Sequence, residues 1–368
     1  MRPAPQLEVG MSVLPAPAAR PAALNTRTLP FSWYSDPGIF RREQSEIFGR
    51  SWLYAGPAHA VAQSGDFFRI DIGGVPVLVT RGRDGELHAM VNVCRHRGAE
   101  VKLERSGNCP ALTCHYHAWT YALDGSLASA PRARQEAGFD KAQLGLRKLR
   151  VDTYGPFIFV SLDDGIEPLA AYLAELPGVV AGTGVNLDRL ELRDRKEYRL
   201  RANWKVVVEN FLECYHCPNA HPGFADVIDL SSYDSEEYGY FSTQHGPPKG
   251  GDADGGRQVR EGRYNFFWPT FSLNIYPGGG NVSTNQIIPV DENNTLAVYE
   301  YFFEEGVDEA EAEATSALIH QVMIEDIVLC ESAQRGMASG QVEEGRLIMR
   351  HEHAVSHFQN LVRNSVGS

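Results

Sequence analysis

The stretch CRHRGAEVKLERSGNCPALTCHYH, residues 94–117, determines how the rest of this chain is interpreted. It contains two Cys/His pairs, Cys94 with His96 and Cys114 with His117, and 17 residues separate His96 from Cys114. A cluster of two irons bridged by two sulfides can take thiolates on one iron and imidazoles on the other. Each pair supplies one thiolate and one imidazole, so two facing ligand loops could enclose one cluster.

Two other interpretations fit the same side chains. A single cysteine or histidine is more often a buried thiol or a satisfied core imidazole than a metal ligand. Zinc also accepts two thiolates and two imidazoles in a tetrahedral site. The residues by themselves therefore indicate a four-ligand site for either an iron-sulfur cluster or zinc.

The residues around these ligands carry a family resemblance. They resemble the Rieske signature of the ring-hydroxylating oxygenases at these positions: Cys94, His96, Arg97, Gly98, Gly107, Asn108, Cys114, Tyr116 and His117. The resemblance implies a Rieske [2Fe–2S] cluster held by the two Cys/His pairs. It favours the cluster over zinc, because zinc motifs pair their ligands with different spacings.

The composition is that of an ordinary globular chain, with 368 residues, 43% hydrophobic residues, 22% charged residues and a formal net charge of -13. This acidity argues against nucleic acid or anionic membrane as a partner. No apolar run has the roughly 18 residues of a membrane span, and the Pro/Ala-rich residues 1–30 lack the apolar core of a signal peptide. We therefore expect a cytoplasmic protein. The cysteines outside the cluster are expected to be free thiols: Cys109, Cys214, Cys217 and Cys330.

The hydrophobic pattern predicts an α+β fold in three parts. Residues 1–36 are expected to form an N-terminal arm. Residues 37–155 are expected to form a small antiparallel β domain, preceded by one short amphipathic helix, because short β-rich runs alternate with turn residues. Residues 156–368 mix helical patterns with antiparallel strands, including a hairpin that turns at residues 291–294 and a last helix over residues 308–337.

A second set of ligands is expected in and after the segment WKVVVENFLECYH, residues 204–216. If residues 204–215 form a helix that Pro218 ends, Glu213 and His216 lie on one helix face, and His221 follows in the next loop. Two such histidines are more often structural than ligating, but the cluster motif upstream favours a metal site. With one carboxylate they would form a facial triad that leaves positions on Fe(II) open for oxygen.

The carboxylate should come from an apolar helix face, because an unpaired carboxylate in a core is costly. In residues 317–337, Asp326 has apolar neighbours at offsets of three and four residues. Glu325 has Gln321 on its face and is expected to face solvent or to form an ion pair. Asp326 is therefore the candidate third ligand.

With these segments the resemblance to Rieske non-heme iron oxygenase α subunits covers nearly the whole chain after residue 30. It implies a helix-grip, START-like catalytic domain in which His216, His221 and Asp326 bind a mononuclear Fe(II). It also implies a homotrimer, in which the cluster of one subunit docks beside the iron of its neighbour and Glu213 bridges the two sites. O2 would be the co-substrate, and a separate flavin or iron-sulfur reductase or a ferredoxin would supply electrons from NAD(P)H.

For the substrate, residues 203–224 resemble the branch of the family that oxidises quaternary ammonium compounds such as stachydrine, carnitine or glycine betaine, because Glu213 stands where most aromatic-ring hydroxylases have Asp. Four aromatic residues could form a cation-binding cage or an ordinary strand core: Phe267, Trp268, Phe271 and Tyr276. We expect hydroxylation of an N-methyl group with loss of formaldehyde. Hydroxylation of an aromatic acid or related ring is the alternative, and a Rieske electron carrier without catalysis is the third interpretation.

Overall fold

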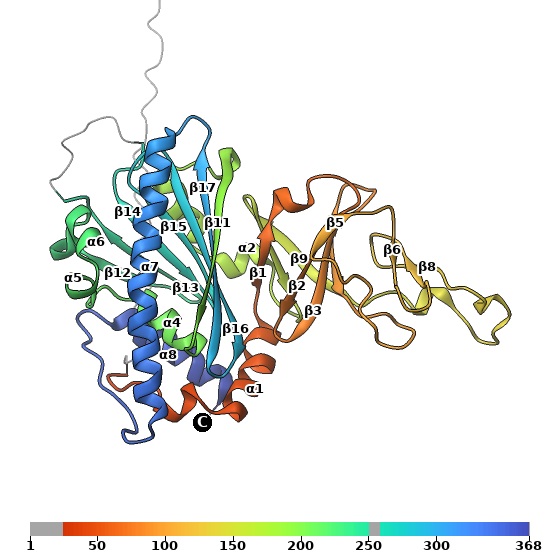
Figure 1. The fold of residues 1–368 in the computed structure, drawn as a ribbon, viewed down its shortest axis with the longest axis horizontal. Helices are drawn as coiled ribbons and strands as arrows, with labels where there is room; N and C mark the ends of the chain where they lie inside the picture. The colour runs from red at the N-terminus through yellow and green to blue at the C-terminus, as the bar shows by residue number, and fades with distance from the viewer. Residues whose placement is uncertain (1–24, 250–257, 368) are drawn as a thin grey trace, which may run out of the picture.

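The computed structural model describes residues 25–249 and 258–367, which form two lobes (Figure 1). Each lobe contains a seven-stranded sheet whose neighbouring strands are antiparallel, and the first lobe adds a three-stranded sheet. Helices cover the sheet of the second lobe (Figure 1). The α+β class and the small antiparallel β domain beside a helix-grip domain are confirmed.

The strands of the first lobe come from before, between and after the two ligand loops in the sequence. In spatial order, its large sheet consists of β1 (Leu53–Pro57), β10 (Phe157–Ser161), β9 (Lys148–Tyr154), β4 (Leu87–Val91), β3 (Val75–Arg81), β2 (Asp66–Ile72) and β5 (Ser106–Asn108). The small sheet consists of β6 (Leu112–Thr113), β7 (Thr120–Tyr121) and β8 (Leu127–Ser129).

The boundary predicted after residue 155 falls inside this lobe. Tyr154 of β9 pairs with Phe157 of β10, and β10 also pairs with β1, so the sheet continues to Ser161. Gly155 has φ +53° and forms the hairpin turn between the two strands. The glycine marks a tight turn within one sheet and not a linker between domains.

The second lobe is organised around a sheet and one long helix. Its strands, in spatial order, are β11 (Leu190–Leu200), β17 (Asn294–Glu304), β16 (Asn281–Asp291), β15 (Phe271–Tyr276), β14 (Gly262–Phe267), β13 (Phe241–Gly246) and β12 (Asp234–Glu237). Its helices are α2 (Leu169–Leu173), α3 (Leu176–Gly182), α4 (Trp204–Phe211), α5 (Cys217–Ala220), α6 (Pro222–Val227), α7 (Glu309–Ala338) and α8 (His353–Val366). The predicted β16–β17 hairpin and the helix predicted over residues 308–337, α7, are confirmed, but α7 is not the last helix, because α8 follows it. Asp308 caps α7 by accepting a hydrogen bond from the Ala310 N–H.

The segment before the first sheet packs on the second lobe. Leu29 and Tyr34 are fully buried, the short helix Phe31–Tyr34 contacts α7, and α1 (Pro37–Glu46) contacts α8. The part of the predicted N-terminal arm that is described, residues 25–36, is therefore an integral part of the fold. Residues 1–24 lie outside the described residues. No helix of the described chain is long and apolar enough to cross a membrane.

A buried ion pair joins this N-terminal segment to the helix that precedes the site. Lys205 on α4 lies 2.5 Å from Glu43 on α1, and both side chains are fully buried. The Trp204 indole N–H donates to the other oxygen of Glu43 at 2.8 Å. Burial lowers the pKa of Lys205, against the opposing effect of Glu43. The pair fixes α1 against α4 at the base of the second lobe.

We expect Lys205→Met to lower the free energy of unfolding by about 3–5 kcal/mol, because it leaves the Glu43 carboxylate buried without its cation. Urea unfolding measures this change. Arg50→Ala is the matched control: it breaks the exposed Glu46–Arg50 pair at the end of α1 and should cost less than about 1 kcal/mol. Similar small losses in both variants would contradict the role of the buried pair.

Candidate active site

The two Cys/His pairs lie on loops with matching backbone geometry. The Gly98 N–H donates to the Cys94 carbonyl at 3.0 Å, and the Ala118 N–H donates to the Cys114 carbonyl at the same distance. Gly98 and Ala118 both have positive φ, +77° and +55°. Each loop therefore turns back on itself directly after its ligand residues, as two loops that face a common cluster require.

The side chains of these loops fit a [2Fe–2S] cluster with one histidine-bound iron. Cys94 and Cys114 are buried, whereas His96 and His117 are exposed and their ring centroids lie 4.7 Å apart. The Tyr121 hydroxyl accepts a hydrogen bond from the Arg95 N–H at 2.9 Å and lies 3.2 Å from the Cys94 sulfur. Its own O–H is thus available to the sulfur, and such hydrogen bonds help to set a cluster's reduction potential.

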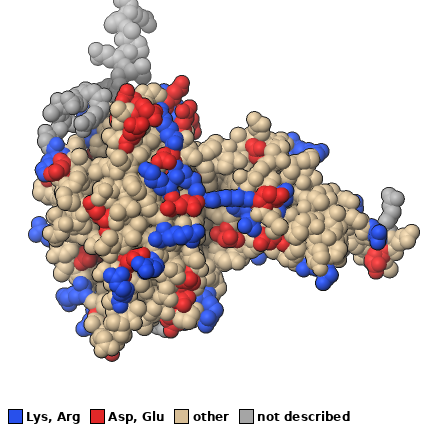
Figure 2. Space-filling view, in the orientation of Figure 1, with Lys and Arg blue, Asp and Glu red and all other residues tan. Residues whose placement is uncertain are grey.

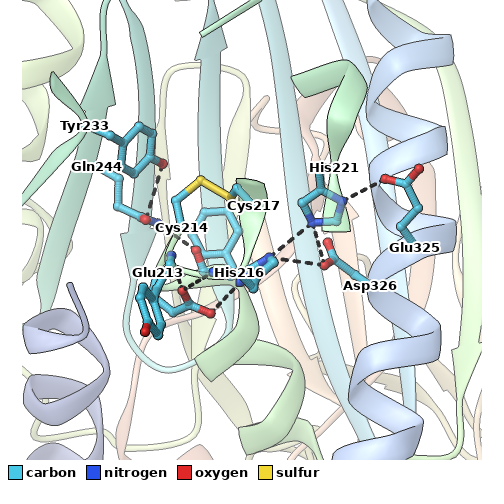
Figure 3. Close-up of a disulfide and its surroundings, with 11 residues drawn as sticks. Glu213, Cys214, His216, Cys217, His221, Tyr233, Gln244, Glu325 and Asp326 are labelled. Atoms are coloured by element: carbon cyan, nitrogen blue, oxygen red, sulfur yellow. Dashed lines mark hydrogen bonds and ion pairs between the residues drawn. A yellow bond between two sulfur atoms is a disulfide. The ribbon is translucent and has the colours of Figure 1, made fainter. Parts of the chain in front are cut away.

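Three side chains converge in the second lobe. The Nε2 atoms of His216 and His221 lie 3.1 Å apart, and Asp326 Oδ1 lies 3.0 Å from His221 Nε2 and 3.5 Å from His216 Nε2 (Figure 3). All three ligand atoms lie within 4.8 Å of one another. A two-His, one-carboxylate set with this convergence suits a non-heme Fe(II) that keeps open positions.

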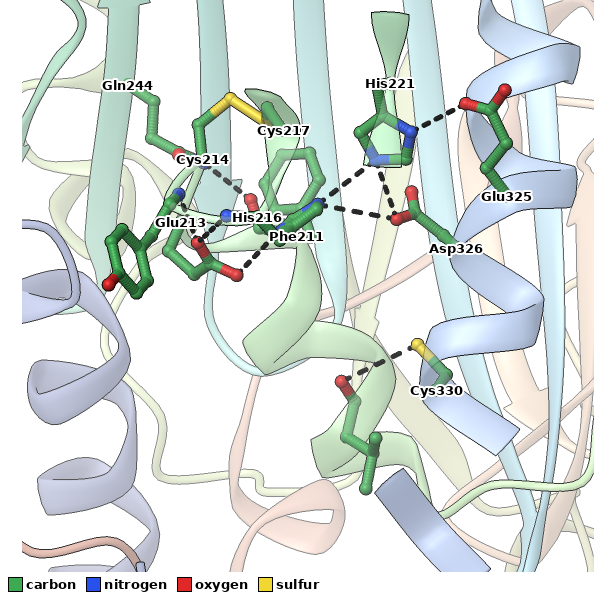
Figure 4. Close-up of polar contacts among 12 residues, drawn as sticks. Phe211, Glu213, Cys214, His216, Cys217, His221, Gln244, Glu325, Asp326 and Cys330 are labelled. Carbon is green, nitrogen blue, oxygen red and sulfur yellow. Dashed lines mark hydrogen bonds and ion pairs between the residues drawn. A yellow bond between two sulfur atoms is a disulfide. The ribbon is translucent and has the colours of Figure 1, made fainter. Parts of the chain in front are cut away.

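Two further carboxylates hold the opposite edges of the imidazole rings. Glu213 bonds to His216 Nδ1, and Glu325 Oε2 lies 2.7 Å from His221 Nδ1 (Figure 4). Although burial works in the opposite direction, Asp326 and Glu213 raise the pKa of His216 to about 9. Because the two carboxylates take the Nδ1 positions, both rings keep their Nε2 atoms for a metal, which is the usual arrangement around a metal-binding histidine. The donor set therefore fits a divalent cation.

Glu325 was expected from its spacing to face solvent or to form an ion pair. One oxygen does accept a hydrogen bond from Gln321, at 2.8 Å, but the other reaches His221. Adjacent helix residues point about 100° apart, so a Glu beside a candidate Asp ligand can reach the same site from the side. That adjacency was the available sequence signal.

The segment that carries Glu213 and His216 is a turn and not the end of a helix. The helix predicted to continue to residue 215 stops at Phe211, and the new helix α5 begins at Cys217 with Pro218 in its first turn. Proline favours this position because its missing N–H would be unpaired there in any case. The Glu213 carboxylate accepts the His216 N–H at 3.2 Å and so stabilises the turn itself.

This turn also corrects the prediction of free thiols at Cys214 and Cys217. The two Cα atoms are 4.9 Å apart, and the sulfurs form a disulfide (Figure 3). Residues three apart are neighbours both on a helix and across this turn, so the spacing allowed the pairing that the prediction of free thiols missed. Cys109 and Cys330 are free, as expected.

The chain matches known families in both lobes. Residues 51–154 match the Rieske [2Fe–2S] domain, and residues 187–368 match the catalytic domain of the ring hydroxylating alpha subunit. The chain is 34% identical to choline monooxygenase of Beta vulgaris, with 90% of this chain and 75% of the relative covered. It belongs to the Rieske non-heme iron oxygenases.

Two further relatives resemble the oxygenase over almost its full length. The oxygenase subunit of carnitine monooxygenase from Escherichia coli strain K12 is 32% identical, with 91% of this chain and 92% of the relative covered. The crystal structure of a quaternary ammonium Rieske monooxygenase with its substrate L-carnitine has a TM-score of 0.82 and 32% identity, with 93% and 96% of the two chains covered. The oxygenase therefore carries a Rieske cluster and a mononuclear iron, receives electrons from a reductase and oxidises a small molecule.

One large cavity of about 1180 Å³ contains the three converging side chains of the oxygenase in its wall. Six aromatic residues also line it: Phe211, Phe224, Tyr233, Tyr264, Tyr276 and Tyr299. Four of them cluster together. Tyr264 is central among them, with ring centroids 5.7 Å from Tyr276, 5.8 Å from Phe224 and 6.3 Å from Tyr233. The cavity therefore combines a candidate iron site with a concentrated aromatic surface.

The structure places the four aromatic residues predicted for the pocket in different surroundings. Tyr276 lines the large cavity, and Phe271 lines a small neighbouring cavity that Asp326 also borders. Phe267 and Trp268 lie in the hydrophobic core, 1% and 2% exposed. Alternate residues of a strand point to opposite sheet faces, so Phe267 points away from the cavity that Tyr264 of the same strand lines.

Replacing Glu325 tests its role as a partner of His221. We expect Glu325→Ala to weaken iron binding about 10- to 100-fold, because the imidazole loses the carboxylate that orients it. Iron content during titration with a chelator measures the affinity. Gln321→Ala removes only the outer hydrogen bond to Glu325 and should retain most of the affinity. Unchanged iron affinity in Glu325→Ala would contradict the assignment.

Proposed function

We propose that the two Cys/His pairs hold the cluster and that His216, His221 and Asp326 hold the iron. The convergence of the three ligand atoms and the matching turns of the two loops support these assignments. When bound, the two groups supply electron transfer and an open coordination position for O2. The protein's own part is to orient the imidazoles, through Glu213 and Glu325, and to position a substrate in the adjoining cavity.

We propose that the substrate is a quaternary ammonium compound. The observation that carries this proposal is the aromatic surface of Phe224, Tyr233, Tyr264 and Tyr276 in the same cavity as the candidate iron ligands. Aromatic faces attract a methylated ammonium group, which cannot donate a strong hydrogen bond. The names of the relatives, choline monooxygenase and carnitine monooxygenase, point to the same class of compound.

The proposed reaction is oxidation of an N-methyl carbon. One oxygen atom of O2 enters a methyl C–H bond, and the other leaves as water with two electrons from the reductase and two protons. The hydroxymethyl product then breaks its C–N bond to release formaldehyde, a proton and a tertiary amine. The cation remains bound to the aromatic rings throughout the oxidation.

A panel of methylated ammonium compounds and aromatic acids, supplied with a generic reductase, tests this reaction. We expect oxygen uptake and formaldehyde with an ammonium compound, and Tyr276→Leu should raise its KM about tenfold, because a desolvated cation–π contact is lost. Tyr240→Leu, which removes a half-exposed ring outside the cavity, should leave KM unchanged. Ring hydroxylation without formaldehyde would overturn the proposal.

We propose further that the oxygenase acts as a homotrimer. Strand β6, next to one ligand loop, and helix α5, next to His216, lie at opposite ends of the molecule (Figure 1). The exposed imidazoles of His96 and His117 suit contact with another subunit. Glu213 would then connect a cluster histidine of the neighbouring subunit to His216.

Two variants expressed together test transfer between subunits. His96→Ala should lose the cluster, and Asp326→Ala should lose the iron while its cluster's visible absorption remains. Neither alone should turn over substrate. Random mixing in trimers should restore about one quarter of the wild-type activity, since an intact iron then meets an intact neighbouring cluster in about one case of four. Assembled but inactive mixtures would contradict electron transfer between subunits.

We place the oxygenase in the cytoplasm, with a separate reductase or ferredoxin that passes on electrons from NAD(P)H. Gly278, Gly279 and Gly280, the glycine run of the second lobe, connect two antiparallel strands, β15 and β16. A dinucleotide-binding run would connect a strand to a helix. This supports a partner that binds the nicotinamide cofactor.

A further inference from the structure

The large cavity forms a passage along α7, and the small cavity adjoins the end of this passage that holds Asp326. One face of α7 lines the passage from Glu311 to Asp326. Asp326 follows Glu311 by 15 residues, which corresponds to about 22 Å along a helix axis. The exposed residues Glu305 and Asp308 line the other end, which therefore opens to solvent, and Figure 2 shows acidic side chains over that end of α7.

Tyr299 on β17 lies where the two cavities meet. It lines both of them together with Asp326, and it is 8% exposed. The charges of Asp326 and of Tyr276 both act on its hydroxyl, so Tyr299 is within electrostatic reach of the candidate iron site and of the aromatic surface. A ligand that occupies those two places must therefore pass close to Tyr299.

The hydroxyl of Tyr299 makes no hydrogen bond to any of the described residues. A buried tyrosine hydroxyl usually has a partner. The hydroxyls of Tyr264 and Tyr301 are also unpartnered, but they are closed off from the surrounding space, whereas that of Tyr299 is not. A ligand in the passage can therefore supply the missing partner.

This hydroxyl is a hydrogen-bond donor under ordinary conditions. Burial, and after it the Asp326 carboxylate, raise the pKa of Tyr299 well above its usual value. The phenol therefore keeps its proton. Its complement on a ligand is an oxygen atom that can accept a hydrogen bond, and a methylated ammonium group has no such atom.

The ring of Tyr299 is held in place from the side. Tyr198 packs edge-on against it, with the ring centroids 5.4 Å apart. The Tyr198 hydroxyl in turn lies 2.8 Å from Nδ1 of His320 on α7. Tyr299 is thus fixed in position before a ligand arrives, which lowers the entropic cost of binding one.

We propose, on the basis of the quaternary ammonium function proposed above, that Tyr299 is a specificity-determining residue that donates a hydrogen bond to a hydroxyl oxygen of the substrate. With a methyl group at the iron and the cation against Tyr276, this oxygen must lie close to the nitrogen. A site that hydrogen-bonds a substrate hydroxyl disfavours an analogue without it, because its own polar group then stays unpaired. The substrate class is therefore a methylated ammonium compound with a hydroxyl group near the nitrogen.

Two pairs of probes test this proposal: choline with ethyltrimethylammonium, and L-carnitine with γ-butyrobetaine. The members of each pair differ only in a hydroxyl group, which lies two carbons from the nitrogen. In calorimetry without the reductase, we expect the holoenzyme to bind the hydroxyl-bearing member about five- to tenfold more tightly. Tyr299→Phe keeps the ring and should abolish this preference, raising KM for the hydroxyl-bearing member by the same factor and leaving the affinity for the other unchanged.

Tyr301→Phe is the matched control. Tyr301 lies two residues further along β17 on the same sheet face, is fully buried and lies outside both cavity walls. This variant should keep the wild-type preference. Equal binding of the two members of a pair by the wild type, or an undiminished preference in Tyr299→Phe, would overturn the assignment of Tyr299. If no methylated ammonium compound binds, the proposed function itself fails, so the two failures are distinguishable.

Discussion

The site depends on two imidazole rings that are each held at Nδ1 by one carboxylate while Nε2 faces another. Glu213 and Glu325 occupy the Nδ1 atoms of His216 and His221, so both Nε2 atoms must face Asp326. One carboxylate comes from the turn after α4 and the other from α7. The geometry therefore exists only if α4 and α7 are fixed relative to each other. Cys330, one turn beyond Asp326 and buried against α4, contributes to that contact (Figure 4).

The parts of the fold with long, regular patterns were predictable from sequence. Helix α7 has 30 residues, with a cap at Asp308, and the β16–β17 hairpin has polar turn residues between two apolar strands. Shorter features were misread where one local pattern fits two structures. A Glu and a His three residues apart meet on a helix, but they also meet across a turn, as Glu213 and His216 do. A hairpin glycine such as Gly155 likewise resembles a linker glycine until its strands are seen to pair.

The aromatic wall shows a further limit of local patterns. The sequence indicates many aromatic residues between positions 264 and 276, but strand phase decides which rings face the cavity. Tyr264 and Tyr276 face it, whereas Phe267 faces the core. Phe224 and Tyr233 come from α6 and from the loop before β12, so only tertiary contacts bring them beside Tyr264. The candidate iron ligands were easier to predict because polar groups in apolar segments are rare and need a partner.

Helix α7 carries Glu311 of the cavity wall and the candidate iron ligand Asp326 on a single rigid element. The number of residues between them therefore sets both their separation along the cavity and their relative orientation. Loss of a single residue between Glu311 and Asp326 would rotate one end by about 100° relative to the other and turn Asp326 away from the histidines. Loss of seven residues would nearly preserve the shared face and shorten the passage by about 10 Å. Natural variation in passage length should thus occur in steps of nearly whole helical turns, such as about seven or about eleven residues.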